Sequence, residues 1–484
     1  MRTKNKLCLL IFTLILFTGI PKTSAIENNP ATFNAVEIKN GSNVSITDCV
    51  SAALKNSPKI KRQKYNLDIA KSNVGIAKSR YFPVISAGVG FYNENNSNEI
   101  YYNRAYRDLP SVGVTINKMV WDFGKTTAYI KMEEFYKLGA QYEFMDSICA
   151  TLFDIKYKYY KVLRAKALLS VAESDVKINE NFVRITHKEP DSVAAKVNLG
   201  EAKVKLIEAQ NEYKNAKTDL ANSMYLDEMF DFNIKNTPTF AYNNDYVYGK
   251  TSNPQKFKYH PFDFDTKNAT EIAYKNSPDL QILISTKNAM EQSLKYVKRT
   301  YLPDLNANVG YGFLNTNLYD TNNSLRVGVN LDTSVNIMEL RHNIKGADAQ
   351  LNLAENEILL FKKDLYYEVQ RALNNVEKAS KQIPVAQQEA QNALKYINLV
   401  EEKYKHDQID YSKFRNARKE YIEAQSEYIK SLSDYNLALI QLEMAMHYHI
   451  VDIHHKSEHA IHYHSDEILE HLDEVFNCDE AENK

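Results

Sequence analysis

The residues with the clearest capacity for chemistry are histidines near the end of the chain. Eight of the twelve histidines follow residue 446, namely His447, His449, His454, His455, His459, His462, His464 and His471. Neutral imidazoles bind Zn²⁺, Cu²⁺ and Ni²⁺ well, and Glu458, Asp466 and Glu467 would add carboxylates. The segment is either a metal-binding appendage, or a flexible polar tail or a strap around the helical part of the protein. We favour the polar tail and predict no metal ligand and no cofactor.

The sequence contains no signature of a catalytic centre. It has no HExxH zinc motif, no GxSxG nucleophile elbow and no phosphate-binding P-loop. Acidic residues are abundant, but they alternate with basic ones along helical stretches, where solvated charge is their usual role. The 60 basic and 61 acidic residues balance, so no nucleic-acid-binding surface is expected. The chain is therefore predicted not to be an enzyme.

The first residues have the pattern of an export signal. Arg2, Lys4 and Lys6 precede an apolar core at 7–20, and Thr23-Ser24-Ala25 supplies small residues for cleavage. The core is shorter than the roughly 20 apolar residues that span a bilayer. We expect residues 1–25 to be a signal peptide, with an uncleaved anchor as the alternative.

The motifs that organise the rest of the chain occur twice. Lys55-Asn56-Ser57-Pro58 returns as Lys275-Asn276-Ser277-Pro278, and Tyr81-Phe82-Pro83 returns as Tyr301-Leu302-Pro303. A capping Ser followed by Pro predicts the start of a helix. The later aromatic-x-Pro predicts its end, because the residue before Pro disfavours helical backbone. The sequence therefore predicts an internal two-fold repeat.

After each aromatic-x-Pro, the period of the apolar pattern changes from helical to two. Residues 85–92 and 305–313 alternate apolar with small or polar side chains. Second alternating runs follow at 112–117 and 325–332, after polar loops expected at 93–109 and 315–323. Each copy therefore predicts a hairpin of two amphipathic strands.

Each hairpin is followed by long stretches with few helix breakers. Only 14 Gly and 12 Pro occur in 484 residues, well below average usage. Residues 126–187 and 339–405 predict very long helices, and return helices are expected at 192–226 and 412–449. Interleaved charged and Ala or Leu positions are typical of coiled coils. The predicted fold class is mainly α with a small β part.

These elements divide the chain into six expected segments. They are a signal peptide (1–25), an extended leader (26–44), a first repeat (45–226, with its hairpin at 81–122), an inter-repeat segment (227–268), a second repeat (269–449, with its hairpin at 301–335) and a His-rich acidic tail (450–484).

Four strands per chain are too few to close a membrane barrel. The smallest transmembrane barrels have about eight strands, and an open sheet in lipid leaves backbone groups without partners. Three copies would give a twelve-stranded transmembrane β-barrel in contact with lipid. We therefore predict a homotrimer whose long helices form a coiled-coil helical barrel on one side of the membrane.

The ordered motifs resemble those of the TolC family of outer membrane efflux proteins. The resemblance covers about residues 45–449 and includes Trp121-Asp122-Phe123-Gly124-Lys125 after the first hairpin. It implies a trimeric outer-membrane channel continued by a periplasmic helical tunnel, which serves as a passive exit duct in efflux or type I secretion. The implied partners are a periplasmic adaptor and an inner-membrane transporter of the RND or ABC class.

The resemblance also implies functional positions at the turns between the long and return helices. The residues expected to contact the adaptor are His187, Lys188, Asp191, Asp407, Gln408 and Asp410. Asp407 stands where the family usually has Gly, and Asp tolerates a left-handed turn. Some members place two acidic residues, three apart, facing the pore, and the matching positions here are Lys413 and Asn416. Three lysines at a constriction would disfavour cations; a Lys413 that simply faces solvent is the alternative.

A coiled-coil tether or scaffold of the cell envelope, which transports nothing, is the alternative function. The two amphipathic hairpins discriminate between the two, because a tether has no need for them. We therefore expect an outer-membrane protein with a periplasmic helical part.

Overall fold

The computed structural model describes residues 40–94, 107–186, 189–226, 231–237, 265–317, 320–406 and 408–448. All of them fall within one compact unit, Val36–His462. The expected signal peptide, most of the inter-repeat segment and the His-rich tail lie outside the described residues.

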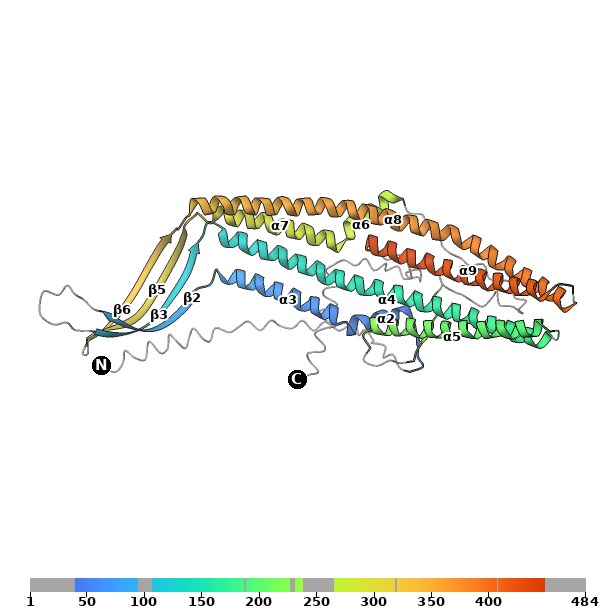
Figure 1. The fold of residues 1–484 in the computed structure, drawn as a ribbon. Coiled ribbons are helices and arrows are strands. Elements are labelled where there is room, and N and C mark those ends of the chain that lie inside the picture. Colours follow the sequence, from blue (N-terminus) through green and yellow to red (C-terminus); the bar gives the residue numbers. More distant parts are fainter. Residues whose placement is uncertain are drawn as a thin grey trace, which may run out of the picture. The chain divides into compact units, whose positions relative to one another are not determined.

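The two repeats contain the same elements in the same order (Figure 1). The first has α2 (Ile46–Asn56), α3 (Pro58–Ser79), β2 (Val84–Glu94), β3 (Arg107–Trp121), α4 (Lys125–Ile185) and α5 (Asp191–Ser223). The second has α6 (Thr266–Asn276), α7 (Pro278–Arg299), β5 (Asp304–Asn317), β6 (Asp320–Asp332), α8 (Ile337–Lys405) and α9 (Tyr411–Met446). The predicted fold class, mainly helical with a small β part, is confirmed.

The repeated Ser-Pro dipeptides begin α3 and α7. The Ser57 hydroxyl accepts a hydrogen bond from the backbone N–H of Ile60 at 3.4 Å, and Ser277 accepts one from Leu280 at 3.3 Å. Both serines are fully buried. Each cap satisfies a backbone donor that the first helical turn leaves free, and the following Pro has no N–H to satisfy.

The four long strands form one antiparallel sheet in the order β2-β3-β5-β6. The pairing of β3 with β5 joins the two repeats within the sheet. Strands β5 and β6 extend into 315–323, where a polar loop was expected, and Asn315 pairs with Thr321. The loop prediction was wrong there because continued antiparallel pairing satisfies backbone groups whatever the side-chain composition.

The junction between the first hairpin and α4 is built by the Trp121–Lys125 motif. The Asp122 carboxylate accepts hydrogen bonds from the backbone N–H groups of Gly124 and Thr126. The Lys125 ammonium lies 2.5 Å from the Asp304 carboxylate, at the start of β5. Gly124 has a φ of 83°, and its carbonyl accepts a hydrogen bond from Arg299 at 2.9 Å. The junction therefore ties the first hairpin to the second repeat.

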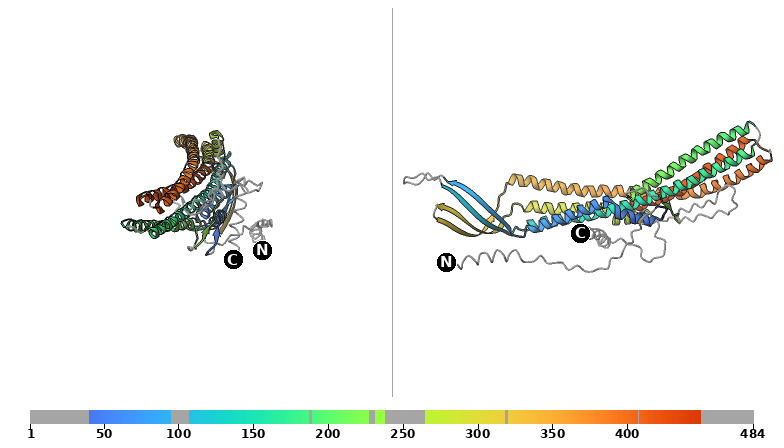
Figure 2. Two further views of the ribbon diagram at one scale, coloured as in Figure 1. Left: turned by 90° about the vertical axis from the view of Figure 1, so that its right-hand side faces the viewer. Right: turned by 90° about the horizontal axis from the view of Figure 1, so that it is seen from below.

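Helix α4 packs against helices of both repeats: α2, α3 and α5 from the first, and α7 and α9 from the second. The largest hydrophobic core surrounds its middle and includes Tyr159 and Tyr160. The Tyr159 hydroxyl lies within hydrogen-bond distance of the carbonyls of Val44 and Lys235. Val44 belongs to β1 (Asn43–Val44), and Lys235 directly follows β4 (Asn233–Ile234), which pairs with β1 in parallel. Figure 2 shows the long helices changing direction near the level of α2.

No described helix contains an apolar stretch long enough to cross a membrane.

Candidate functional site

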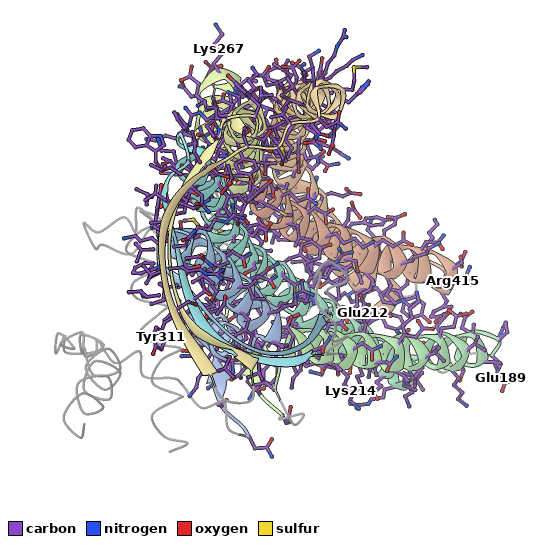
Figure 3. All side chains as sticks on the ribbon, turned by 90° about the vertical axis from the view of Figure 1, so that its left-hand side faces the viewer. Glu189, Glu212, Lys214, Lys267, Tyr311 and Arg415 are labelled. Atoms are coloured by element: carbon purple, nitrogen blue, oxygen red, sulfur yellow. The ribbon has the colours of Figure 1, made fainter. Side chains whose placement is uncertain are left out.

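The candidate site lies at the end of the helices farthest from the strands, where α4 turns into α5 and α8 into α9 (Figure 1). Glu189 in the first turn and Arg415 near the second mark these ends in Figure 3. Asp191 is the first residue of α5, and Asp410 immediately precedes α9. Gln408 and Asp410 are exposed. His187, Lys188 and Asp407 lie outside the described residues.

Four aromatic side chains, Phe182, Tyr404, Tyr411 and Phe414, fill the space between the two helix pairs, and we call them the tip cluster. The rings of Phe182 and Phe414 stack with centroids 3.3 Å apart and planes 14° apart. Tyr404 and Tyr411 lie 5.4 and 6.2 Å from Phe182. Aromatic pairs add stabilisation beyond the area they bury. The cluster therefore favours close packing of the α4–α5 turn against the α8–α9 turn.

Two hydrogen bonds between side chains also join these ends. The Asn198 amide on α5 donates to the Tyr411 hydroxyl at 2.7 Å. The hydroxyls of Thr186 and Tyr404 lie 3.3 Å apart. Burial raises the pKa of Tyr411, so its hydroxyl stays protonated at neutral pH. The two tips that were predicted separately are therefore one connected structure.

A buried charged group lies between α4 and α9, farther from the turns than the tip cluster. The Arg418 guanidinium donates to the Asn179 side-chain carbonyl and approaches the Asp175 carboxylate, with Nε and Oδ1 3.5 Å apart. The Asn179 amide donates to Asp175 at 3.2 Å. The Arg418 and Asp175 side chains are 8% and 3% exposed. Burial raises the pKa of Asp175, and the Arg418 charge opposes that rise.

Two further ion pairs continue along the same helix contact. The Lys156 ammonium lies 3.0 Å from the fully buried Glu443 carboxylate. Arg164 and Asp434 pair at 3.7 Å in a more exposed position. We call the contact of α4 with α9 the inter-repeat seam. Its paired charges fix how the two helices align, since a slip by one turn would leave charges buried without partners.

The predicted constriction residues lie on an exposed face of α9. Lys413 and Asn416 are both exposed, whereas Phe414 and Ala417 between and beside them are buried. The same face continues with Glu420, Glu423 and Glu427, which are also exposed. Sequence reasoning missed these three acids. They follow Asn416 at successive intervals of four, three and four residues, a spacing that places them on one face of a helix.

Across the described ranges, no group of three or more His, Cys, Asp or Glu side chains is placed to hold a metal ion. Burial raises the pKa of the thiols of Cys49 and Cys149 to about 12, so neither is a nucleophile at neutral pH.

Comparison with known proteins agrees with this picture. The sequence profile of the family described as outer membrane efflux protein matches residues 49–224 and 270–446, one match in each repeat. No curated protein matches the chain significantly.

Solved structures of outer-membrane channels have the same fold. The Campylobacter jejuni CmeC outer membrane channel matches with a TM-score of 0.70 at 16% identity, covering 88% of this chain and 93% of CmeC. Vibrio cholerae VceC matches at 0.68 and 14%, covering 83% and 95%. The open state of the Neisseria gonorrhoeae MtrE channel matches at 0.68 and 12%, covering 87% and 96%.

The profile covers more than half of the sequence, and it matches both repeats rather than one. The predicted membership of a TolC-like family is thereby confirmed, and that family is one of channels rather than enzymes. The protein belongs to the outer membrane efflux protein family, as an efflux channel of the outer membrane with a periplasmic helical part.

Proposed function

We propose that three copies of this chain form a passive duct from the periplasmic side of an inner-membrane transporter to the outside of the cell. The observation that carries closure into a ring of copies is the four-stranded sheet, whose outer strands β2 and β6 each have one partner in the described sheet. An unpaired strand edge is costly in lipid, because no water satisfies its N–H and C=O groups. Strand β2 of a second copy would satisfy the free edge of β6.

The directions of the strands support closure by further copies. Neighbouring strands are antiparallel throughout the sheet, so β2 and β6 run in opposite directions. A contact of β6 with β2 of the next copy is therefore antiparallel as well, and the pattern continues around a ring.

The two faces of the sheet support the same arrangement. Ile85, Ile116, Val309 and Val327 lie side by side across the four strands. The apolar side chains of β6 at 325, 327, 329 and 331 are 63–73% exposed, so no described part of the single chain covers them. Lipid would cover this face, while the opposite face would line the lumen.

At the other end we propose that Lys413 and Asn416 line the narrowest part of the helical tunnel. The tip cluster and the inter-repeat seam hold this end closed in one chain, and separating the two helix pairs would widen it. A periplasmic adaptor would make contact at the tips, through His187, Lys188, Asp191, Asp407, Gln408 and Asp410. An RND or ABC transporter of the inner membrane would supply the cargo, in drug-type efflux or in type I secretion.

Cysteine crosslinking between β6 and β2 tests the trimeric duct. Single cysteines at Val327 or Val329 are combined with one at Ile85 or Val89, since facing residues of antiparallel strands bring Cβ atoms within about 5.5 Å. Oxidation of outer-membrane fractions should give one favoured combination and a ladder that stops at three copies. The Val327→Cys single variant is the control. A monomer band alone for every combination would contradict the duct.

The gate assignment needs a separate measurement. Ion selectivity of the protein in planar bilayers is compared with that of Lys413→Asp and of Lys419→Asp, a nearby exposed lysine on α9. Replacement of three pore-lining charges should move the selectivity toward cations only for Lys413→Asp. Unchanged selectivity would remove Lys413 from the constriction.

A further inference from the structure

One charged side chain lies in the middle of the polar face of the sheet. Arg326 on β6 is directly opposite Gly310 on β5, and Gly310 is opposite Thr115 on β3. Thr115 in turn faces Ser86 on β2. Since side chains alternate between faces, this row lies on the face opposite to Leu325 and Val327.

The described rows of the sheet next to Arg326 contain no acid to neutralise it. The two adjacent rows on its face are Gly88, Gly113, Gly312 and Ser324, and Val84, Asn117, Asn308 and Gly328. The Arg326 side chain is exposed and forms no ion pair or hydrogen bond with the described residues. Because five of these twelve positions, its own row included, are glycines, few side chains limit access to the guanidinium.

Along β6 the acids that share the alternation of Arg326 are Asp320, six residues before it, and Asp332, six residues after it. At about 3.4 Å per residue this is roughly 20 Å along the strand, or more than twice the Debye length of about 8 Å at physiological salt. The position of Asp332 opposite Asp304, which pairs with Lys125, places it at the helix junction. The electrostatic potential near this position is therefore dominated by the charge of the Arg326 guanidinium itself.

The curvature of the sheet places this face on the inside. In Figure 3 the sheet is curved, and Tyr311 lies on its convex side. Tyr311 is in the apolar row with Val114 and Leu325, so the row of Arg326 belongs to the concave face. In the proposed duct, three Arg326 side chains would share one level of the lumen. The next copy would add Val84–Gly90 of β2, a stretch without a carboxylate.

We propose that Arg326 forms an anion-attracting ring in the lumen of the strand region. The ring would attract ions and cargo that carry anionic oxygen atoms, such as carboxylate, sulfonate or phosphate groups. A guanidinium binds such groups through paired N–H donors and keeps its charge at any physiological pH. The inference rests on the proposed duct and adds a charge preference at its outer end, separate from Lys413 at the tip.

Reversal potentials in planar bilayers under a KCl gradient provide the first test. We expect the ratio of chloride to potassium permeability to fall about threefold in Arg326→Gln at 0.1 M salt. Arg326→Lys, which keeps the charge, should retain the ratio of the natural chain. The difference should shrink at 1 M salt, where the Debye length is about 3 Å. The matched control is Lys118→Gln, since Lys118 lies opposite Ala307 in an apolar row and should not affect the ratio.

Block by inorganic tripolyphosphate provides a second test, which reports on the strand end alone. Added on the side of the strands, the polyanion should reduce the current of the natural chain, of Arg326→Lys and of Lys118→Gln. The block should weaken at least tenfold in Arg326→Gln. Equal permeability ratios and equal block in Arg326→Gln and the natural chain would overturn the role of Arg326 while leaving the duct intact. Absence of any conductance in the natural chain would instead remove the duct and the ring together.

Discussion

Replacement of Arg418 by Leu should loosen the inter-repeat seam near the tips. The guanidinium is 8% exposed and pairs with Asp175, which is 3% exposed. Removal of one partner of a buried pair costs about 3–5 kcal/mol, because the remaining charge stays buried without compensation. Each 1.4 kcal/mol is a tenfold change in an equilibrium constant, so local opening should become roughly one hundred to four thousand times more frequent.

Hydrogen–deuterium exchange of the purified protein measures this opening directly. Peptides of α4 around Asp175 and of α9 around Arg418 should exchange faster by that factor, while peptides around Tyr159 should not change. Lys419→Leu is the matched control. Lys419 forms an exposed pair with Glu423, and such pairs contribute less than about 1 kcal/mol.

A double replacement, Asp175→Leu with Arg418→Leu, separates loss of charge pairing from loss of packing. Replacement of both partners of a buried pair by apolar residues is often neutral, so the double variant should recover most of the slow exchange. The reasoning would be refuted if Arg418→Leu exchanged like the natural chain, or if the double variant were as fast as the single one.

Three further predictions concern stability, each followed by thermal unfolding. Burial, and next the neighbouring carboxylates, raise the pKa of Asp146 from 3.8 to about 6. Its contribution to stability is thus fully present below pH 3.8 and lost as the pH rises through about 6, so Asp146→Asn should raise the melting temperature at pH 8 more than at pH 4. Gly124→Ala should cost about 1–3 kcal/mol, because φ is positive and a Cβ would meet Arg299 Nη1 at 2.7 Å; Gly75→Ala, in open space within α3, should instead stabilise by up to about 1 kcal/mol. Ser57→Ala should cost about 1 kcal/mol through loss of the cap of α3, and an unchanged melting temperature would show that the cap contributes nothing.

The parts of the fold that local rules determine could be predicted from the sequence. Ser57 and Ser277 predicted the starts of two helices correctly, because capping needs only a hydroxyl three residues before a free backbone N–H. The strands were visible because one face of each is apolar at a period of two. The prediction of a loop in the Asn-rich segment at 315–323 was wrong, because backbone pairing there depends on the partner strand and not on the composition of the segment.

The paired charges of the inter-repeat seam could not be predicted. Asp175 and Arg418 each lie on a helix with many charged residues, and neither differs in sequence from a solvated charge. Their burial depends on how α4 and α9 align, which is set by packing between the repeats. For the tips, the structure brings Asp191, Gln408 and Asp410 to one end of the molecule, and their contact with an adaptor stays a prediction.

The antiparallel order of the sheet has a consequence for stoichiometry. Each copy contributes four strands, and its two outer strands run in opposite directions. A ring built from two, three or four copies would therefore have the same antiparallel neighbours at every seam. The strands can determine whether a ring closes, but they do not determine how many copies it contains. We propose that the angle at which the helices of adjacent copies meet selects that number. Exposed apolar side chains such as Ile69 and Ile76 of α3 would be available for that contact.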